Sequence, residues 1–263
     1  MENLLLPSKI EFIADNDNKN AGAVVISPCY HGYGATIGNT LRRVLLSSLP
    51  GAAVDAFKIK GVQHEFSAVP GVKEDAVEII LNLKQLALKV FSDESVVLTL
   101  TKKGVGPVTA GDIKKDANVE VINKDLVIAN ITDAKNVFDM EIIVNRGRGF
   151  KPVEEKEKKN YDLGTIIIDS SYSPIKDVGY NVEYTRVGDI TNYEKLTLNI
   201  ETSGAISVEE SVREASQLIM DHFSIVLNGL YGNGLMSVKE EDAEVKTKTE
   251  KKIKKTVKSK KKQ

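Results

Sequence analysis

The sequence predicts an α+β fold, because patterns typical of helices and of strands occupy different parts of the chain instead of alternating. Two long amphipathic patterns lie near the two ends, at residues 32–49 and 207–230. Between them, most apolar residues fall into short runs that end at Gly, Pro, Asn or Asp. We therefore expect a long helix near each end and a largely β middle that contains one short helix.

The chain begins with a predicted β-hairpin and a helix. The apolar-rich runs 8–14 and 23–27 flank the polar cluster 15–20, a composition typical of a turn. The helix is expected within 32–51, because glycines open this stretch and Pro50-Gly51 closes it.

This first helix has two different faces. At 100° per residue one face carries Ile37, Leu41, Val44 and Leu45, and the opposite face carries Asn39, Arg43 and Leu46. An apolar Leu46 beside the planar donor fork of Arg43 is typical of a docking surface. The alternative is a surface helix with solvated arginines, and periodicity alone favours that alternative.

The middle of the chain reads as strands around one short helix. The helix is expected over 74–84, with Val77, Ile80, Leu81 and Leu83 buried. The expected strands are 53–60, 86–91, 96–101, several short runs within 104–131, 138–146 and 163–169. Along 138–146 the side chains alternate, which puts Phe138, Met140, Ile142 and Val144 on one face. The charged run 153–160 is expected to be a solvated loop, and 172–174 a turn.

Two strands and the longest helix follow. The polar stretch 188–192 joins the predicted strands 181–187 and 195–201, and Ser207 with Glu210 matches a capping box. Helical spacing then continues through Val212, Ala215, Ile219, Phe223, Val226, Leu227 and Leu230. Because Leu218 and Ile225 lie off this stripe, we expect burial on two sides, one of them against the same helices of a second copy.

The last residues differ in charge from the rest. Residues 239–263 hold 11 Lys against 5 acidic residues, whereas the first 238 hold 25 Lys and Arg against 32 Asp and Glu. We expect 236–263 to be a disordered, lysine-rich tail. It is either an arm attracted to nucleic acid or a solubilising segment, and composition does not separate the two. The acidic body favours protein partners.

A cytoplasmic location is expected. Cys29 is the only cysteine, so an intrachain disulfide is impossible and a reducing compartment fits. The apolar run at Leu4 to Leu6 stops at Pro7, unlike a secretory signal, and no stretch has the length and apolarity of a membrane span.

The stretch 34–51, Gly-Ala-Thr-Ile-Gly-Asn-Thr-Leu-Arg-Arg-Val-Leu-Leu-Ser-Ser-Leu-Pro-Gly, resembles the signature helix of the alpha subunits of bacterial DNA-directed RNA polymerases. Further resemblances follow in the family's order, at residues 61–66, 71–84, 104–109, 146–150, 169–174 and 180–183. The resemblance covers the chain from about Leu6 to about Asn228.

The resemblance implies an assembly subunit of a nucleotidyltransferase, itself non-catalytic and homodimeric, on which the beta and beta-prime subunits assemble for transcription. It implies a dimerisation subdomain of residues 1–50 plus 176–235 and a largely β insert subdomain of residues 51–175. Arg43 and Leu46 match positions that dock beta, and Glu78, Lys84 and Ile168 match positions tied to beta-prime. Because the first and last long helices pair across the dimer in this family, the expected dimer interface comprises Ile37, Leu41, Leu45, Ile219, Phe223, Val226 and Leu230.

Members of this family usually continue into a separate C-terminal domain that binds upstream DNA and activators. Here the lysine-rich tail stands in its place. We therefore expect DNA contact only through the assembled enzyme, or a weak, sequence-blind contact by the tail.

A nucleotide-binding enzyme is the alternative from another class. Gly32, Gly34 and Gly38 precede helical spacing as in a dinucleotide loop, and Asp55 follows about 20 residues on, as the acidic residue of that motif does. However, the glycine spacing is one residue too long, and no alternating strand and helix pattern follows. The glycines fit a tight entry to the helix better.

No catalytic, metal-binding or cofactor-binding residues are predicted. His31, His64 and His222 are scattered, and with Cys29 they form no metal-ligand spacing. Acidic pairs such as Glu209-Glu210 fall in first turns of helices, where negative charge is favourable in any case. No Ser/His/Asp arrangement or magnesium-binding aspartate cluster is present in the sequence.

Overall fold

The structure is a computed structural model that describes residues 5–16, 18–156, 161–188 and 190–230, and the statements below concern these residues. The chain divides into two compact units, residues 1–215 and 216–263. The helices are α1 (Tyr33–Ser47), α2 (Ala76–Lys84) and α3 (Val208–Leu230), with short 3₁₀ turns at Ala110–Asp112 and Val153–Glu155. An α+β fold is confirmed.

One antiparallel sheet joins strands from distant parts of the sequence. Its order is β1 (Lys9–Ala14), β2 (Ala21–Cys29), β14 (Ile190–Thr202), β13 (Ile175–Val187). The two outer pairs are the predicted hairpins, and the central pair places Val24 opposite Leu198. The hairpin of β13 and β14 is longer than expected, because its ladder continues past the predicted strands at both ends, from the pair Ile175 and Thr202 to the pair Val187 and Ile190.

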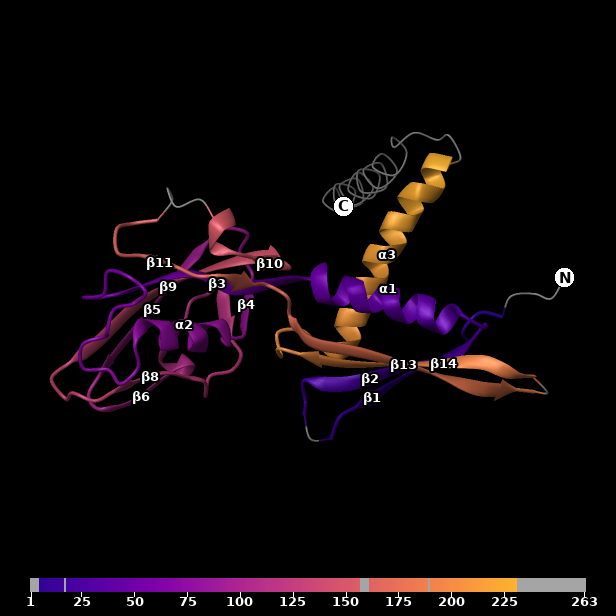
Figure 1. Ribbon diagram of the computed structural model, residues 1–263, viewed down its shortest axis with the longest axis horizontal. Coiled ribbons are helices and arrows are strands. Elements are labelled where there is room, and N and C mark those ends of the chain that lie inside the picture. The colour runs from indigo at the N-terminus through magenta and orange to yellow at the C-terminus, as the bar shows by residue number, and fades with distance from the viewer. Residues whose placement is uncertain (1–4, 17, 157–160, 189, 231–263) are drawn as a thin grey trace, which may run out of the picture. The chain divides into compact units, whose positions relative to one another are not determined.

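Helix α1 lies across one face of this sheet (Figure 1). Two glycines allow the close approach: an added Cβ would lie 2.9 Å from Val182 at Gly34, and 2.8 Å from the Tyr180 ring at Gly38. Gly32 precedes the helix with a φ of 83°, a left-handed conformation that glycine adopts without strain. Gly32 therefore forms the tight turn that was expected at the start of the helix. Gly34 and Gly38 instead allow the helix to lie close to the sheet.

The remaining strands lie between residues 50 and 171. A second antiparallel sheet has the order β11 (Ile166–Ile167), β3 (Pro50–Ile59), β9 (Val137–Arg148), β5 (Val96–Lys103). Three two-stranded sheets complete this part of the chain: β4 (Leu88–Val90) with β7 (Val119–Val121), β6 (Gly106–Thr109) with β8 (Val127–Ile131), and β10 (Phe150–Lys151) with β12 (Ser170–Ser171).

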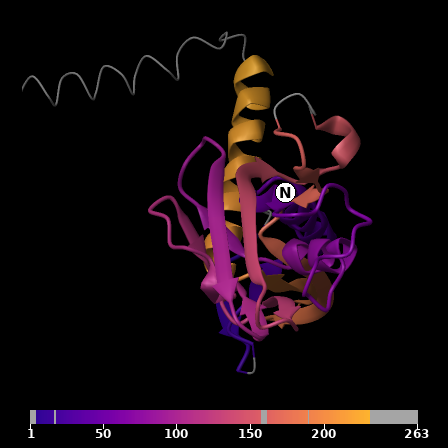
Figure 2. The same cartoon turned by 90° about the vertical axis from the view of Figure 1, so that its left-hand side faces the viewer.

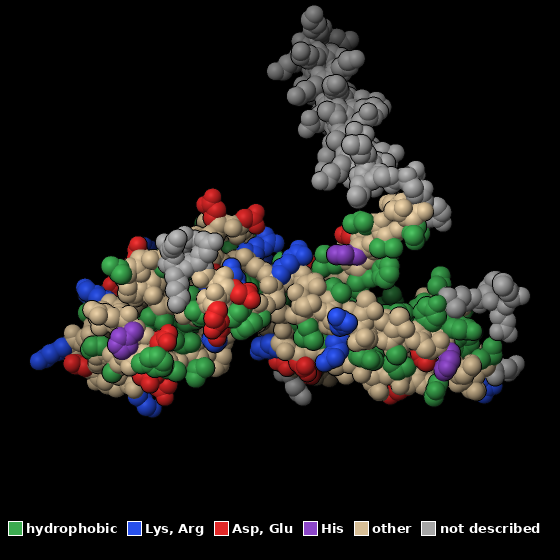
Figure 3. Space-filling model, turned by 45° about the horizontal axis from the view of Figure 1, so that its top comes forward, with side chains coloured by type: hydrophobic (Ala, Val, Ile, Leu, Met, Phe, Trp, Pro, Cys, Tyr) green, Lys and Arg blue, Asp and Glu red, His purple; other side chains and the backbone are tan. Residues whose placement is uncertain are grey.

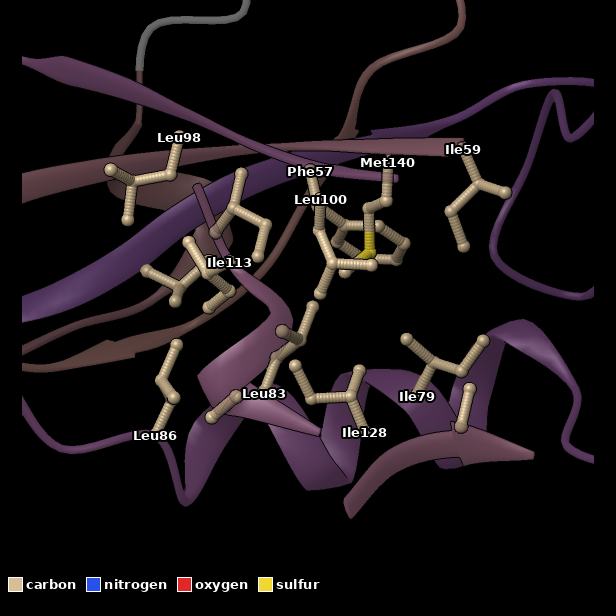
Figure 4. Packing of buried hydrophobic residues seen from close by; sticks show 14 of the residues in the cluster. Phe57, Ile59, Ile79, Leu83, Leu86, Leu98, Leu100, Ile113, Ile128 and Met140 are labelled. Carbon is tan, nitrogen blue, oxygen red and sulfur yellow. The ribbon is translucent and has the colours of Figure 1, made fainter. Parts of the chain in front are cut away.

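Helix α2 packs on one face of the second sheet, as Figures 1 and 2 show. Phe57, Leu100 and Met140 of the sheet point toward the side chains of α2 (Figure 4). All three are buried within one continuous core formed by residues 54–168. The predicted inward face of β9 is confirmed, because Phe138, Met140, Ile142 and Val144 are all buried.

The predicted buried face of α2 is confirmed at Leu83 and wrong at Leu81. The inward positions are Ala76, Ile79 and Leu83, whereas Leu81 is 56% exposed. The Asn82 side chain donates a 2.9 Å hydrogen bond to the Ile128 carbonyl and so helps to fix the helix rotation. Because the Ala76 side chain is small, it contributes little to the apolar pattern, and the sequence does not indicate this buried face.

Three other predictions for the middle of the chain differ from the structure. The strand expected over 163–169 contracts to the two residues of β11. The strands expected at 86–91 and 96–101, which a short turn at 92–94 would join, belong to different sheets, since β4 pairs with β7 and β5 pairs with β9. The run 153–160 is not wholly solvated, because Lys156 is buried, while 157–160 lie outside the described residues.

The long C-terminal helix is confirmed as α3, and the Ser207 hydroxyl accepts a 3.2 Å hydrogen bond from the Glu210 backbone N–H. The predicted tail 236–263 lies outside the described residues, and the predicted subdomain boundaries stay a prediction. None of the described helices combines the length and the apolar character needed to cross a membrane.

Candidate subunit interface

The outer face of α1 presents a cation beside an apolar side chain. Arg43 and Leu46 are both exposed, as the sequence predicts. The neighbouring Arg42 is held instead, since its Nε donates a 3.1 Å hydrogen bond to the Val178 carbonyl of the sheet. Among the described residues, no hydrogen bond or ion pair engages the Arg43 side chain, which leaves its donors available to another molecule.

Two residues of the predicted dimer interface are buried on the inner face of α1. Leu41 is 5% exposed and Leu45 is fully buried within the single chain, so neither has surface to offer a second copy. Ile37 is partly exposed. The apolar face of α1 was predicted correctly, but strands β13 and β14 of the same chain already cover most of it.

A carboxylate occupies the N-terminus of α1. The buried Glu194 accepts hydrogen bonds from the backbone N–H groups of Gly32 at 2.8 Å and Gly34 at 2.9 Å, and His31 Nδ1 lies 3.5 Å from it. These are the donors that a phosphate would need in a dinucleotide loop. Since Asp55 is also buried, the nucleotide-binding alternative is wrong for residues 32–38.

Helix α3 carries the most continuous apolar surface of the described residues. Phe223 is 63% exposed and Leu230 is 80% exposed, and Figure 3 shows hydrophobic side chains along this helix. Ile219 is partly buried and Val226 is exposed. Further exposed apolar side chains lie between the predicted positions, at Met220, Ile225 and Leu227.

The residues predicted to dock beta-prime do not form one exposed patch. Glu78 is in the first turn of α2 and Lys84 in the last, about 9 Å apart along the axis at ~1.5 Å per residue. Lys84 Nζ lies 2.9 Å from Asp169 Oδ2, and this hydrogen bond is the main cause that lowers the pKa of Asp169. Ile168 is 2% exposed, so it can only support a docking surface from beneath.

A buried polar network that no sequence pattern predicted lies beside Lys84 and Asp169. Lys156 Nζ is 3.1 Å from Asp55 Oδ1, and the Ser170 hydroxyl donates to the same carboxylate at 2.6 Å. Tyr172 and Asn145 also donate hydrogen bonds to Asp55. An aspartate within the apolar run of β3 was the available signal, whereas nothing distinguished Lys156 within its charged run.

The network keeps Asp55 ionised. Burial by itself raises the pKa of Asp55, but hydrogen bonds from Ser170, Tyr172 and Asn145, with the charge of Lys156, outweigh it and leave the pKa below its ordinary value. Burial lowers the pKa of Lys156, an effect that Asp55 partly offsets. Hydrogen bonds thereby link Lys156, Ser170 and Tyr172 to Asp55 of β3. Within the part of the chain that the structure describes, no three His, Cys, Asp or Glu side chains form a metal-binding group.

Known proteins resemble this chain over most of its length. The sequence model of the RNA polymerase Rpb3/RpoA insert domain matches residues 57–173. The DNA-directed RNA polymerase subunit alpha of Desulforamulus reducens is 49% identical over 219 residues, which cover 83% of this chain and 69% of that protein. This chain belongs to the family of bacterial DNA-directed RNA polymerase alpha subunits.

Other alpha subunits match at similar levels. That of Carboxydothermus hydrogenoformans is 48% identical over 87% of this chain and 74% of its own length. That of Oceanobacillus iheyensis is 46% identical over 90% of this chain and 76% of its own length. The insert-domain match spans Glu78, Lys84 and Ile168, so these three residues lie in the part that defines the insert of alpha subunits.

Proposed function

We propose that this alpha subunit is the assembly platform of a bacterial DNA-dependent RNA polymerase. Two copies pair, and the pair then holds the large beta and beta-prime subunits. The observation that carries the proposal is the exposure of six large apolar side chains between Met220 and Leu230 of α3. An apolar surface of this continuity is unfavourable in water and typical of a protein interface.

Pairing through a two-fold axis requires only one self-complementary surface. The exposed stripe of α3, with Ile219, Phe223, Val226 and Leu230, supplies the apolar side chains for it. Ile37 of α1 remains a candidate because it is partly exposed. Leu41 and Leu45 are left out of the proposed interface, since their surface is buried within one chain.

The large subunits would use surfaces outside the α3 stripe. Arg43 and Leu46 present a free guanidinium and an apolar contact, which suit carbonyl or carboxylate acceptors of beta. Glu78 and Lys84 would contact beta-prime, with Ile168 packed underneath. The chemistry of nucleotide addition would lie in those partners, and this chain would contribute no catalytic residue and bind no cofactor.

Co-expression with beta and beta-prime tests the platform. Tagged wild-type chain should retain both large subunits on an affinity column, whereas Arg43→Ala should stay dimeric but retain much less beta. Arg146→Ala is the matched control, because this exposed arginine of β9 pairs, among the described residues, with the exposed Asp93 alone. Normal capture of beta by the Arg43→Ala variant would contradict the assigned role.

DNA contact and location are further parts of the proposal. The 11 lysines of residues 239–263 would attract DNA phosphates without reading sequence, and all other DNA contact would come from the assembled cytoplasmic enzyme. Deleting 239–263 should weaken DNA binding at low salt. Unchanged DNA affinity would show instead that the lysines only keep the chain soluble.

A further inference from the structure

A groove in the insert lies outside all the surfaces discussed above. It encloses about 450 Å³ between the end of β4, strand β5, the segment after the 3₁₀ turn at Ala110–Asp112, and β7. Its apolar lining includes Phe91, Leu98, Ile113 and Val119. Lys114, Lys115 and Lys124 line it as well, and we refer to it as the basic groove.

The floor of the basic groove is preformed. Leu98, Ile113 and Val119 are buried members of the insert core, and Figure 4 shows the first two within it. Backbone hydrogen bonds hold the rim, from Lys114 N–H to the Thr99 carbonyl at 2.9 Å and from Gly111 N–H to the Lys124 carbonyl at 2.8 Å. A ligand would therefore meet fixed apolar walls and lose little free energy in ordering them.

Phe91 supplies the exposed apolar contact at the groove. Its side chain is 59% exposed, and its backbone N–H is fixed by a 2.9 Å hydrogen bond to the Asn118 carbonyl. Lys89 Nζ lies 5.9 Å from the centre of the Phe91 ring, which adds a fourth cation beside the groove. A large apolar side chain exposed beside buried apolar walls is a suitable anchor for a partner side chain.

The charge of the groove is opposite to that of the body. Three lysines line it against two acidic residues, Asp116 and Glu120. The Asp116 carboxylate accepts a 2.8 Å hydrogen bond from Asn118 N–H, which fixes its position but leaves its charge. The first 238 residues carry a net negative charge. A local positive site on a negative body selects an acidic partner.

We propose that the basic groove binds an acidic peptide segment of a partner protein, with one large apolar side chain of that segment seated against Phe91 and the groove walls. This goes beyond the proposed assembly function, which uses other residues. A protein segment fits better than a nucleic acid strand, because the buried walls require an apolar side chain as well as negative charge. Stacking of a base on Phe91 is the competing possibility that the test separates.

A fluorescent peptide of sequence Asp-Glu-Asp-Phe-Glu-Leu-Asp-Glu is the probe, and its anisotropy is measured with the full-length chain. We expect saturable binding that weakens by at least about tenfold in a Lys114→Glu/Lys115→Glu variant. The same loss is expected in Phe91→Ser, and when Phe and Leu of the peptide become Ser. A Lys60→Glu/Lys135→Glu variant is the charge-matched control, because both lysines are exposed and lie outside the groove, and it should bind as the wild type does.

Three outcomes would overturn the proposal. The first is no saturable binding of the peptide by wild-type chain. The second is equal weakening by the control variant, which would show a general charge effect. The third is tighter binding of a labelled oligothymidylate of equal charge with the same dependence on Phe91, which would assign the groove to single-stranded nucleic acid. Circular dichroism spectra that match the wild type are required of each variant, and Lys114 and Lys115, being exposed, should meet that requirement.

Discussion

Large apolar side chains are buried in the core of the insert but exposed along helix α3. The insert collects its large apolar side chains from β3, α2, β5 and β9 into one buried core, and its exposed ones, such as Phe66 and Phe150, are scattered along the sequence. Helix α3 instead exposes six large apolar residues within its last three turns, from Met220 to Leu230. The first arrangement stabilises a single chain, whereas the second leaves apolar surface that none of the other described residues covers.

Charged side chains show the same contrast between burial within the chain and exposure at its surface. Asp55 of β3 and Lys156 are buried and hydrogen-bonded within the chain. Arg43 of α1 is exposed, and among the described residues its guanidinium has no acceptor. Variants of the insert should therefore change the stability of one chain, and variants of Arg43 and α3 should change association. The variants below test that division.

The largest loss of stability is expected from the centre of the insert core. Phe57→Ala removes a fully buried ring between the sheet and α2, so the free energy of unfolding should fall by about 3–5 kcal/mol. Urea denaturation followed by circular dichroism measures this loss. A similar loss from Phe223→Ala would remove the contrast, since Phe223 is mostly exposed.

Asp55→Asn should cost about 3 kcal/mol at neutral pH, because it leaves the buried Lys156 without its countercharge. The folded-state pKa of Asp55 is lowered, so its stabilisation is complete above the unfolded pKa of about 3.9 and is lost as the pH falls through the folded value. The difference in unfolding free energy between wild type and variant should therefore shrink on acidification below about pH 4. A difference independent of pH would mean that Asp55 is not held ionised.

A smaller effect is expected where α1 meets its sheet. In Gly38→Ala the new methyl would lie 2.8 Å from the Tyr180 ring and 2.9 Å from Leu196, which should cost about 1–3 kcal/mol. Gly179→Ala in β13 is the matched control, because no atom lies within 4 Å of its added Cβ, and a stabilisation of less than about 1 kcal/mol is expected. Thermal denaturation of the two variants should show opposite shifts.

The sequence predicted elements with strong periodicity and failed where a tertiary contact decided the outcome. Strand β9 and helices α1 and α3 follow their apolar patterns closely. The inward face of α2 depends on Ala76, a residue too small to dominate a pattern. The pairing of β4 with β7 depends on residues far apart in sequence, which local patterns do not report.

In the candidate site, too, features set by helix geometry were predicted, whereas features set by tertiary contacts were not. The outward direction of Arg43 and Leu46 follows from helix geometry and was predicted. The burial of Leu45 depends on two glycines that let α1 lie close to the sheet, and Ile168 is buried in a core collected from residues far apart in sequence. The carboxylate of Glu194 at the N-terminus of α1 is 160 residues from Gly34 in sequence, so no local motif indicates it.

Sedimentation equilibrium of the full-length chain and of its Phe223→Asp variant tests most directly the claim that α3 is exposed in order to pair. The wild type should sediment as a dimer, and Phe223→Asp should sediment as a monomer with an unchanged circular dichroism spectrum, because the substitution places a charge in the apolar contact. A wild-type monomer at the concentrations used for assembly, or a Phe223→Asp variant that stays dimeric, would contradict the account.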